Sequence, residues 1–422
     1  MDQIRFAGDV NLTAVEIVGA KGQFLNIKGM VVEVQIFEDI NSPFTTGKII
    51  LQDSMDLINY FPFIGQEYVR IEIKTPTFTD QKKIINETFY MYKLTNREQV
   101  GDRAVMYELH FISTEAVYDI NLRFSKAFEG TASDIISKIF KSAFVTQKTF
   151  AFFEPTTNKT KFVACNWSPI RTINYVAKTS VNNNRSNYMF FENKYGYNFT
   201  TLQNIYEKSE VYQNFQLTAQ TRDIDPDSGR TLKNPALDYT KIIEFDMPVG
   251  FDYMDRTLNG MYASKIITHD YVTKKYSTKT YNVVDEFKKQ PSLNPFPIFT
   301  ESVSRNSGAL YLNEPKHYGI HNGHGDISNT KNALNRIGLM KLSQAFKFNI
   351  TVAGRTDYTV GQIVSVKMPT FEPHTSPNTP DVYDRMFSGK YMISALNHVI
   401  KTDRHETHME LIKDSLIINL DG

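Results

Sequence analysis

Residues 65–77, GQEYVRIEIKTPT, have a shorter counterpart at residues 361–370, GQIVSVKMPT. Each stretch opens on Gly-Gln, continues with apolar residues at every second position and closes on Pro-Thr. Alternation with a period of two is typical of a strand that buries one face, and Pro does not continue a central strand. The two stretches therefore predict equivalent strands in two copies of one β-unit.

The hairpins downstream of these stretches match as well. In both halves a Tyr-Met pair is followed twelve residues later by Asp-Arg, and the hairpin ends on Glu-Leu. The matched pairs are Tyr90-Met91 with Tyr391-Met392, Asp102-Arg103 with Asp403-Arg404, and Glu108-Leu109 with Glu410-Leu411. The shared order favours a duplication; the alternative is two unrelated β-domains with a common strand–turn pattern.

Upstream, the same kind of match assigns the start of each copy. Gly29-Met30, Asp39 and Lys48 have spacings of ten and nine residues, as do Gly260-Met261, Asp270 and Lys279. This alignment predicts that residues 25–115 superimpose on residues 255–290 joined to 342–415. The longer second copy then requires an insertion near residues 291–341, which starts Pro-rich and ends in a helix near 330–346.

The segment between the two copies has a different pattern. Thr131, with Asp134 three residues later, resembles a capping box, and Ser168 with Pro169 predicts a second helix start. Residues 188–202 predict a hairpin. The expected fold is mainly β with α+β parts: two tandem homologous antiparallel β-barrels plus small α+β domains. The expected divisions are 1–120 (first barrel), 121–235 (α+β), 236–290 with 342–415 (second barrel), 291–341 (insertion) and 416–422 (tail).

Composition excludes several classes of protein. The 422 residues carry 47 Lys and Arg against 46 Asp and Glu, a net charge of +1, which does not suit a dedicated nucleic-acid binder. The single cysteine, Cys165, permits no internal disulfide and fits a reducing cytoplasm. No secretory leader or membrane span is expected. The five Asn-x-Ser/Thr sequons, which start at Asn11, Asn86, Asn158, Asn198 and Asn349, are therefore expected to be unmodified.

The order of these segments resembles the hub proteins of contractile phage tail baseplates and the hub portion of type VI secretion spike proteins. The resemblance rests on the strand sets, on EGTASDIISKIF (129–140), on NWSPIRTINYVAK (166–178), on the 187–202 hairpin and on residues 347–369. It implies a non-enzymatic structural subunit of the virion tail, a homotrimer assembled in the host cytoplasm. Its two barrels would give a pseudo-six-fold ring.

The same resemblance implies the partners of such a subunit. The ring would join the tail tube, or a protein that initiates the tube, to a central membrane-piercing spike. Other baseplate proteins would surround it, and DNA would pass passively through its centre. Eleven residues follow Leu411, so the spike is expected to be a separate chain. No cofactor and no membrane anchor are expected.

A few side-chain groupings could carry chemistry. His317, His321, His324 and Asp326 have the residue types of a tetrahedral zinc site, but they lie in a Gly-rich loop, so they are weak metal candidates. In His405-Glu406-Thr407-His408 the histidines are three apart on an expected strand, and so they should face opposite sides.

Two further groupings are weaker. Asp223, Asp225 and Asp227 imitate a calcium loop whose twelfth position, Asn234, is not Glu. Cys165 beside Trp167 is expected to be a core or interface residue rather than a nucleophile.

Two other functions remain open from the sequence. The first is a carbohydrate-binding or adhesin-like β-protein of a tail or cell surface, which requires an exposed aromatic platform in one copy. The second is a metal-dependent hydrolase built on the His317 loop. No catalytic residue is predicted for the hub function.

Overall fold

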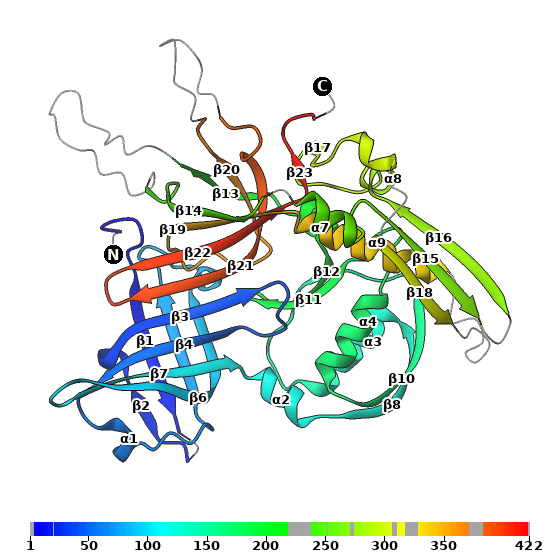
Figure 1. Ribbon diagram of the computed structural model, residues 1–422. Helices are drawn as coiled ribbons and strands as arrows, with labels where there is room; N and C mark the ends of the chain where they lie inside the picture. The colour runs from blue at the N-terminus through cyan, green and yellow to red at the C-terminus, as the bar shows by residue number, and fades with distance from the viewer. Residues whose placement is uncertain are drawn as a thin grey trace, which may run out of the picture.

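One large β-sheet organises the chain in the computed structural model (Figure 1). The structure describes residues 4–19, 21–217, 238–250, 252–270, 274–305, 310–316, 328–370 and 383–420. Eight strands of this sheet lie side by side in the order β14-β19-β22-β21-β3-β4-β7-β6, and all of these neighbours are antiparallel. The first four strands in this order belong to the second half of the chain, and the last four belong to the first half.

The first copy wraps its strands around a core of its own, which contains Val34, Ile71 and Tyr107. The sheet continues from β6 through β5 and β1 to β2. The elements are β1 (Asn11–Val18), β2 (Phe24–Asn26), η1 (Lys28–Met30), β3 (Val31–Asp39), β4 (Thr46–Asp53), α1 (Leu57–Tyr60), β5 (Tyr68–Lys74), η2 (Gln81–Lys83), β6 (Ile85–Gly101) and β7 (Ala104–Ser113).

The second copy encloses a separate core, which contains Phe348, Tyr391 and Leu411. Its β20 pairs with β21, as β5 pairs with β6, and β13 joins β20 in parallel. The elements are β13 (Val211–Gln216), β14 (Ile242–Val249), β19 (Phe346–Ala353), β20 (Ile363–Lys367), β21 (Gly389–Lys401) and β22 (His405–Lys413).

Strand registers confirm the duplication in the region of the quoted stretches. Tyr68, three residues after Gly65, lies opposite Tyr90; Val364, three residues after Gly361, lies opposite Tyr391. Both glycines have positive φ, +79° and +85°, a conformation that glycine adopts without a Cβ clash. The Asp-Arg pairs lie at the β6–β7 and β21–β22 turns.

The predicted start of the second copy is wrong. Lys48 in β4 forms an ion pair with Glu108, with Nζ 3.1 Å from Oε1; the same 3.1 Å contact joins Lys347 in β19 to Glu410. The counterpart of Lys48 is therefore Lys347, not Lys279. By the same sheet order, β14 and β19 correspond to β3 and β4.

The strands predicted around residues 262–267 and 281–284 form a different sheet, β16-β15-β18, from β15 (Ala263–Asp270), β16 (Lys275–Asn282) and β18 (Leu310–Lys316). Helix α9 (Ser328–Ser343) contacts β15 and β16. Ile266, Tyr281 and Leu334 share a core that is separate from both copies. These strands bury their apolar faces against a helix, so they are not the first strands of the second barrel.

The insertion is accordingly larger than predicted, because it occupies all of the chain between β14 and β19. It also contains α7 (Tyr253–Leu258), α8 (Val283–Phe287), β17 (Phe296–Pro297) and η3 (Glu301–Arg305), and β17 pairs with β23 (Ser415–Leu416) near the C-terminus. The predicted helix near residues 330–346 is confirmed by α9.

The segment between the copies is a small α+β unit (Figure 1), but β13, which the predicted range of 121–235 included in it, joins the sheet of the second copy. Thr131 Oγ1 accepts from the amide of Asp134, and Ser168 Oγ accepts from the amide of Arg171, so both predicted helix starts are confirmed. Its elements are α2 (Glu115–Asn121), β8 (Phe124–Thr131), α3 (Ala132–Ala143), β9 (Phe150–Phe153), β10 (Lys159–Trp167), α4 (Pro169–Thr179), β11 (Tyr188–Asn193), β12 (Gly196–Thr201) and α5 (Leu202–Lys208).

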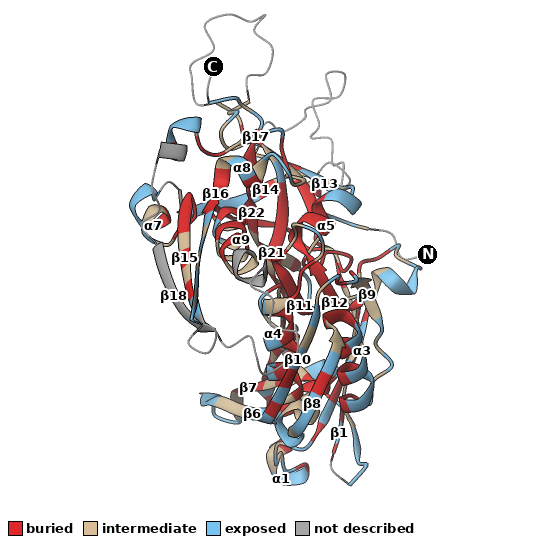
Figure 2. Ribbon diagram, turned by 90° about the vertical axis from the view of Figure 1, so that its right-hand side faces the viewer, coloured by how far each residue is buried: buried red, intermediate tan, exposed pale blue. Residues whose placement is uncertain are grey.

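Strands β11 and β12 of this unit are buried along their full length (Figure 2). They hold the unit against both copies: Phe191 packs in the core of the second copy, and Glu192 accepts a hydrogen bond from the Thr45 amide in the first. None of the described helices is long and apolar enough to cross a membrane.

Candidate functional site

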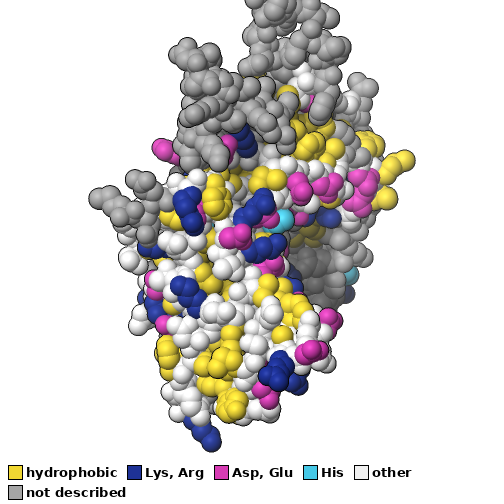
Figure 3. All heavy atoms as spheres, turned by 90° about the vertical axis from the view of Figure 1, so that its left-hand side faces the viewer, with side chains coloured by type: hydrophobic (Ala, Val, Ile, Leu, Met, Phe, Trp, Pro, Cys, Tyr) yellow, Lys and Arg dark blue, Asp and Glu magenta, His cyan; other side chains and the backbone are white. Residues whose placement is uncertain are grey.

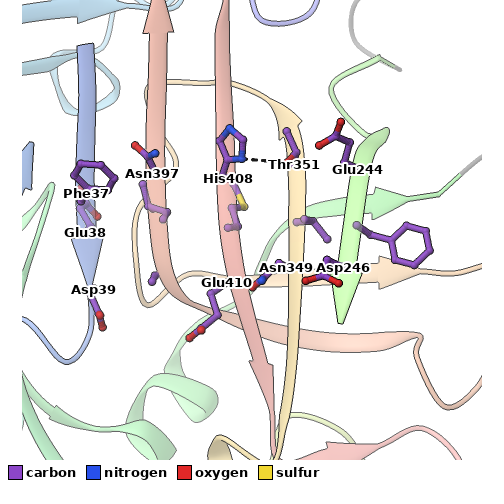
Figure 4. Close-up of a pocket in the computed structure, with 15 residues that line it drawn as sticks. Phe37, Glu38, Asp39, Glu244, Asp246, Asn349, Thr351, Asn397, His408 and Glu410 are labelled. Atoms are coloured by element: carbon purple, nitrogen blue, oxygen red, sulfur yellow. Dashed lines mark hydrogen bonds between the residues drawn. The ribbon is translucent and has the colours of Figure 1, made fainter. Parts of the chain in front are cut away.

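The most extended candidate site is one face of the shared sheet. A shallow hollow lies on it where the two copies meet (Figure 4). Three consecutive residues of each of β3, β21, β22, β19 and β14 line it. The first and third of each three share a face of the sheet, because alternate side chains of a strand point to the same side. The polar lining residues on this face include Asp39, Glu244, Asp246, Asn349, Thr351, Asn397, His408 and Glu410.

Charges on this face are mixed in sign. The lysines at its alternate positions on β14, β19, β22, β3, β4, β7 and residues 395–401 of β21 are Lys48, Lys347 and Lys401. The carboxylates there are Glu33, Asp39, Glu108, Glu244, Asp246, Glu406 and Glu410. Acidic groups outnumber lysines, so this face does not form a basic stripe of the kind that binds nucleic acid.

Two of the three lysines form ion pairs with carboxylates at diagonal positions on the neighbouring strand, in the Lys48–Glu108 and Lys347–Glu410 pairs. Lys401 lies 3.9 Å from Glu33 across the β21–β3 seam. The view in Figure 3 likewise shows Lys and Arg side chains interspersed with Asp and Glu. Pairing of this kind leaves little free positive charge on the face.

His405 and His408 point to opposite sides of β22, as predicted. His408 is exposed in the hollow, with Nδ1 3.2 Å from Thr351 Oγ1 (Figure 4), whereas His405 is fully buried. His405 Nε2 lies 3.0 Å from Nδ1 of the equally buried His398. The two histidines of the His-Glu-Thr-His run therefore cannot share a metal.

Burial determines the protonation of the inner pair. It lowers the pKa of His398 to about 4, with a smaller contribution from the positive charge of Lys194. Burial also lowers the pKa of His405 well below its ordinary value. Both rings are neutral at neutral pH, so one ring nitrogen can donate to the other.

A buried ionic cluster joins the first copy to the α+β unit. The Nζ of Lys148 lies 3.6 Å from Glu115 and 3.7 Å from Glu87, and it donates a hydrogen bond to Glu192. Burial raises the pKa of Glu192, and the positive charge of Lys148 opposes that shift. One lysine thus ties together residues from β6, α2 and β11.

A second buried carboxyl, Glu38, ties the two copies together. It accepts hydrogen bonds from the Thr359 hydroxyl and the Val360 amide of the second copy. Burial raises the pKa of Glu38 to about 7, and these two hydrogen bonds limit the rise. The sequence could not single out Glu38 or Lys148, because their partners lie far away along the chain.

The other predicted site residues have different outcomes. His317, His321, His324 and Asp326 lie outside the described residues, and so does the Asp223–Asp227 loop. Among the residues that the structure describes, no three His, Cys, Asp or Glu side chains gather as metal ligands.

Cys165 is exposed on β10, so it is not a core residue, and its place in an interface stays a prediction. Its neighbour Trp167 stacks on Phe162, with ring centroids 6.1 Å apart. The thiol therefore lies beside a packed aromatic cluster without belonging to it.

Comparison with known proteins places this architecture. No protein-family model matches the chain. The chain is 20% identical over 410 residues to a probable baseplate hub protein, gp334, of Vibrio phage KVP40, across 93% of this chain and 92% of that protein.

Two solved structures share the fold. One is a tail protein from Neisseria meningitidis MC58, with a TM-score of 0.54 at 10% identity, covering 95% of this chain and 96% of that one. The other is the 43 kDa tail protein of prophage MuSo2 from Shewanella oneidensis, with a TM-score of 0.54 at 7% identity over 95% and 98%.

These likenesses define the class of protein: a mainly β chain with the fold of phage tail proteins. The more particular resemblance, to the phage tail baseplate hub family, is also confirmed, because a probable baseplate hub protein matches nearly the whole chain at 20% identity.

Proposed function

We propose that this chain is a structural, non-catalytic subunit of a contractile phage tail baseplate hub. It acts as a homotrimer that joins the tail tube to a central spike and leaves a conduit for DNA. The observation that carries the proposal is the duplicated unit, seen in the matching registers at Tyr68–Tyr90 and Val364–Tyr391. The full-length likeness to a baseplate hub protein supports it.

Duplication suits a chain that must connect two symmetries. Three chains with two similar units each present six similar units around an axis, whereas three chains with one unit present only three. The two units are already side by side in one sheet through the β3–β21 pairing. Repeating that arrangement three times gives a ring with pseudo-six-fold symmetry.

The polar face of the shared sheet is the proposed wall of the conduit. Its paired and mainly acidic charges would let a polyanion pass without binding it. In this proposal the first barrel is residues 1–120, the α+β unit runs from residue 121 to the start of β13, and the second barrel comprises β13, β14 and β19–β22. The insertion lies outside the ring.

The adhesin alternative has less support. A sugar-binding platform needs several aromatic rings on one exposed surface of one copy, whereas the aromatic residues lining the hollow are Phe37 from the first copy and Phe245 from the second. Electron micrographs of the purified protein would test the hub proposal. End-on averages should show a ring of six similar lobes around an opening, and isolated single-chain particles would overturn the proposal.

A further inference from the structure

Buried polar side chains without partners gather where the insertion meets the α+β unit. Asn187 and Asn335 are both 0% exposed, and neither the nitrogen nor the oxygen of either side-chain amide has a hydrogen-bond partner among the described residues. Asn187 directly precedes β11, and Asn335 lies in α9, which contacts α4. Buried polar groups of folded proteins are nearly always paired, with protein, ordered water or a bound ion, so this contact calls for a ligand.

Arg336 brings a positive charge to the same contact. Its Nη1 donates to the carbonyl oxygens of Ser186 and Tyr188, which are 3.1 and 2.7 Å away. Ser186 and Tyr188 flank Asn187, and Asn335 directly precedes Arg336, so each amide belongs to a residue next to one that makes this contact. A guanidinium has five N–H donors, and the two carbonyls on Nη1 leave those of Nε and Nη2 for other acceptors.

The charge of Arg336 is not balanced by a carboxylate. In the described part of the chain Arg336 forms no ion pair, and burial alone shifts its pKa, lowering it to about 10, so the group is charged at neutral pH. Glu286 accepts a hydrogen bond from Asn184, near this contact, but its ion pair is with Lys289. A cation withdrawn from water without an opposite charge is unfavourable, and a bound anion would remove that cost.

Two hydroxyl groups of the insertion belong to the same set. Tyr281 and Ser264 are each 2% exposed and lie opposite one another in the β15–β16 pairing, and neither hydroxyl has a partner among the described residues. The phenol of Tyr281 lies against Gly338, where an added Cβ would be 2.4 Å from Oη. Gly338 follows Asn335 by three residues, so the phenol and the Asn335 amide share a side of α9. Polar groups that share a side without bonding to each other are commonly bridged by a third species.

We propose that Arg336, Asn187 and Asn335 bind a small monovalent anion, and that chloride is the ion they take in solution. The site offers N–H and O–H donors around one positive charge, which suits an acceptor of charge −1. A divalent anion would leave one negative charge unbalanced. The unpartnered atoms are enclosed, so an acidic side chain of another protein does not reach them. The ion would tie α9 of the insertion to the start of β11.

Bromide substitution locates the ion directly, because bromide replaces chloride and scatters anomalously. Crystals of the whole chain grown in sodium bromide should show an anomalous difference peak in contact with the guanidinium of Arg336 and with the amide of Asn187 or Asn335. Density at that place without an anomalous signal would identify water and overturn the proposal. So would bromide bound only at exposed lysines.

Thermal unfolding tests the same site in solution. A ligand that binds only the folded chain stabilises it, so raising chloride from about 5 to about 300 mM should raise the melting temperature by roughly 2 °C or more. Gluconate, which is too large for an enclosed site, replaces chloride in the low-chloride sample and keeps the ionic strength constant. Arg336→Met should melt alike in the two salts. Asn335→Leu, which keeps the cation and removes one donor, should show a smaller rise than the parent.

Arg256 provides the matched control. Its Nη2 also donates to two carbonyl oxygens, those of Gly250 and Ala345, but among the described residues no unpartnered side chain lies next to either of them. Arg256→Met should therefore lower the melting temperature in both salts and keep the full chloride-dependent rise. The proposal is wrong if the parent melts at one temperature in both salts, or if Arg336→Met or Asn335→Leu keeps the whole rise.

Discussion

The imidazole of His398 lies against that of His405 inside the second copy, with Nδ1 of the first 3.0 Å from Nε2 of the second. His398 Nε2 also lies 3.2 Å from the Tyr358 carbonyl oxygen, and Thr407 Oγ1 lies 3.3 Å from Nδ1. Lys194 and Asp357 are the charged groups that act on His398. This pair is an acid-sensitive element in the core next to the β3–β21 seam.

Lowering the pH should therefore destabilise the second copy through these rings. The pKa of His398 in the folded chain is lowered to about 4. Between that value and the pKa of the unfolded chain, this ring binds a proton in the unfolded state but not in the folded state. The contribution of these rings to the free energy of unfolding is fully present above the unfolded pKa of about 6.5. It is lost as the pH falls toward 4, by up to about 1.4 kcal/mol per pH unit for each ring. Urea unfolding from pH 7.5 to 4.5 measures the loss.

His405→Gln is the comparison for this prediction. The variant should be less stable at pH 7.5, and the gap to the parent should narrow as the pH falls. Glu38 titrates in the opposite sense, because its pKa is raised to about 7, but it affects both proteins alike. A gap that is constant across the pH range would contradict the account.

Lys148→Met should destabilise the protein by about 3–5 kcal/mol, because it leaves the buried Glu115 and Glu192, and the partly buried Glu87, without their cation. Lys161→Met is the control, since the Lys161–Glu129 pair is about half exposed and its loss should cost 0–1 kcal/mol. Adding Glu192→Gln to Lys148→Met should restore part of the stability. Equal small effects at both lysines would show that the cluster is not structural.

The proposed conduit should not hold DNA. At about 0.15 M salt the purified oligomer should bind long duplex DNA more weakly than micromolar, and Phe37→Lys with Asn349→Lys and Asn397→Lys should create salt-sensitive binding. Three lysines on the β8–β10 ribbon, at the exposed Ser125, Ala127 and Val163, are the matched control and should have less effect. Submicromolar binding by the parent, falling steeply with salt, would favour a DNA-binding role.

Metal removal should leave stability unchanged. A structural zinc ion can contribute as much as about 10 kcal/mol to folding, so a zinc site at His317 and His321 would be obvious in thermal unfolding. We expect the His317→Ala, His321→Ala double variant and the parent to melt alike, with chelator or with added zinc. A large chelator-dependent drop in the parent alone would restore the metal-site hypothesis.

Local patterns predicted the parts of the fold that local forces determine. The equivalent strands after Gly65 and Gly361, the helix starts at Thr131 and Ser168 and the placement of His405 and His408 on opposite faces depend on residues close together in the chain. Each has a stereochemical reason that is visible in sequence: strand alternation or an orphan amide near a helix start.

The start of the second copy could not be found in this way. Gly29 lies in η1 without positive φ, while Gly260 has a φ of +75° after α7, so the two glycines are not equivalent. What identifies the true counterpart of Lys48 is a long-range contact, between Lys347 and Glu410. Spacing cannot reveal a pairing that skips an insertion with its own sheet and core. The buried partners of Lys148 and Glu38 were hidden for the same reason.

The mass of the purified protein in solution tests the central claim most directly. A ring of three 48.5-kDa chains has a mass of about 145 kDa, and light scattering on a size-exclusion column resolves this from one or two chains. We predict a single species near 145 kDa at micromolar concentration. A stable species of 48.5 kDa over the same range would contradict the trimeric hub.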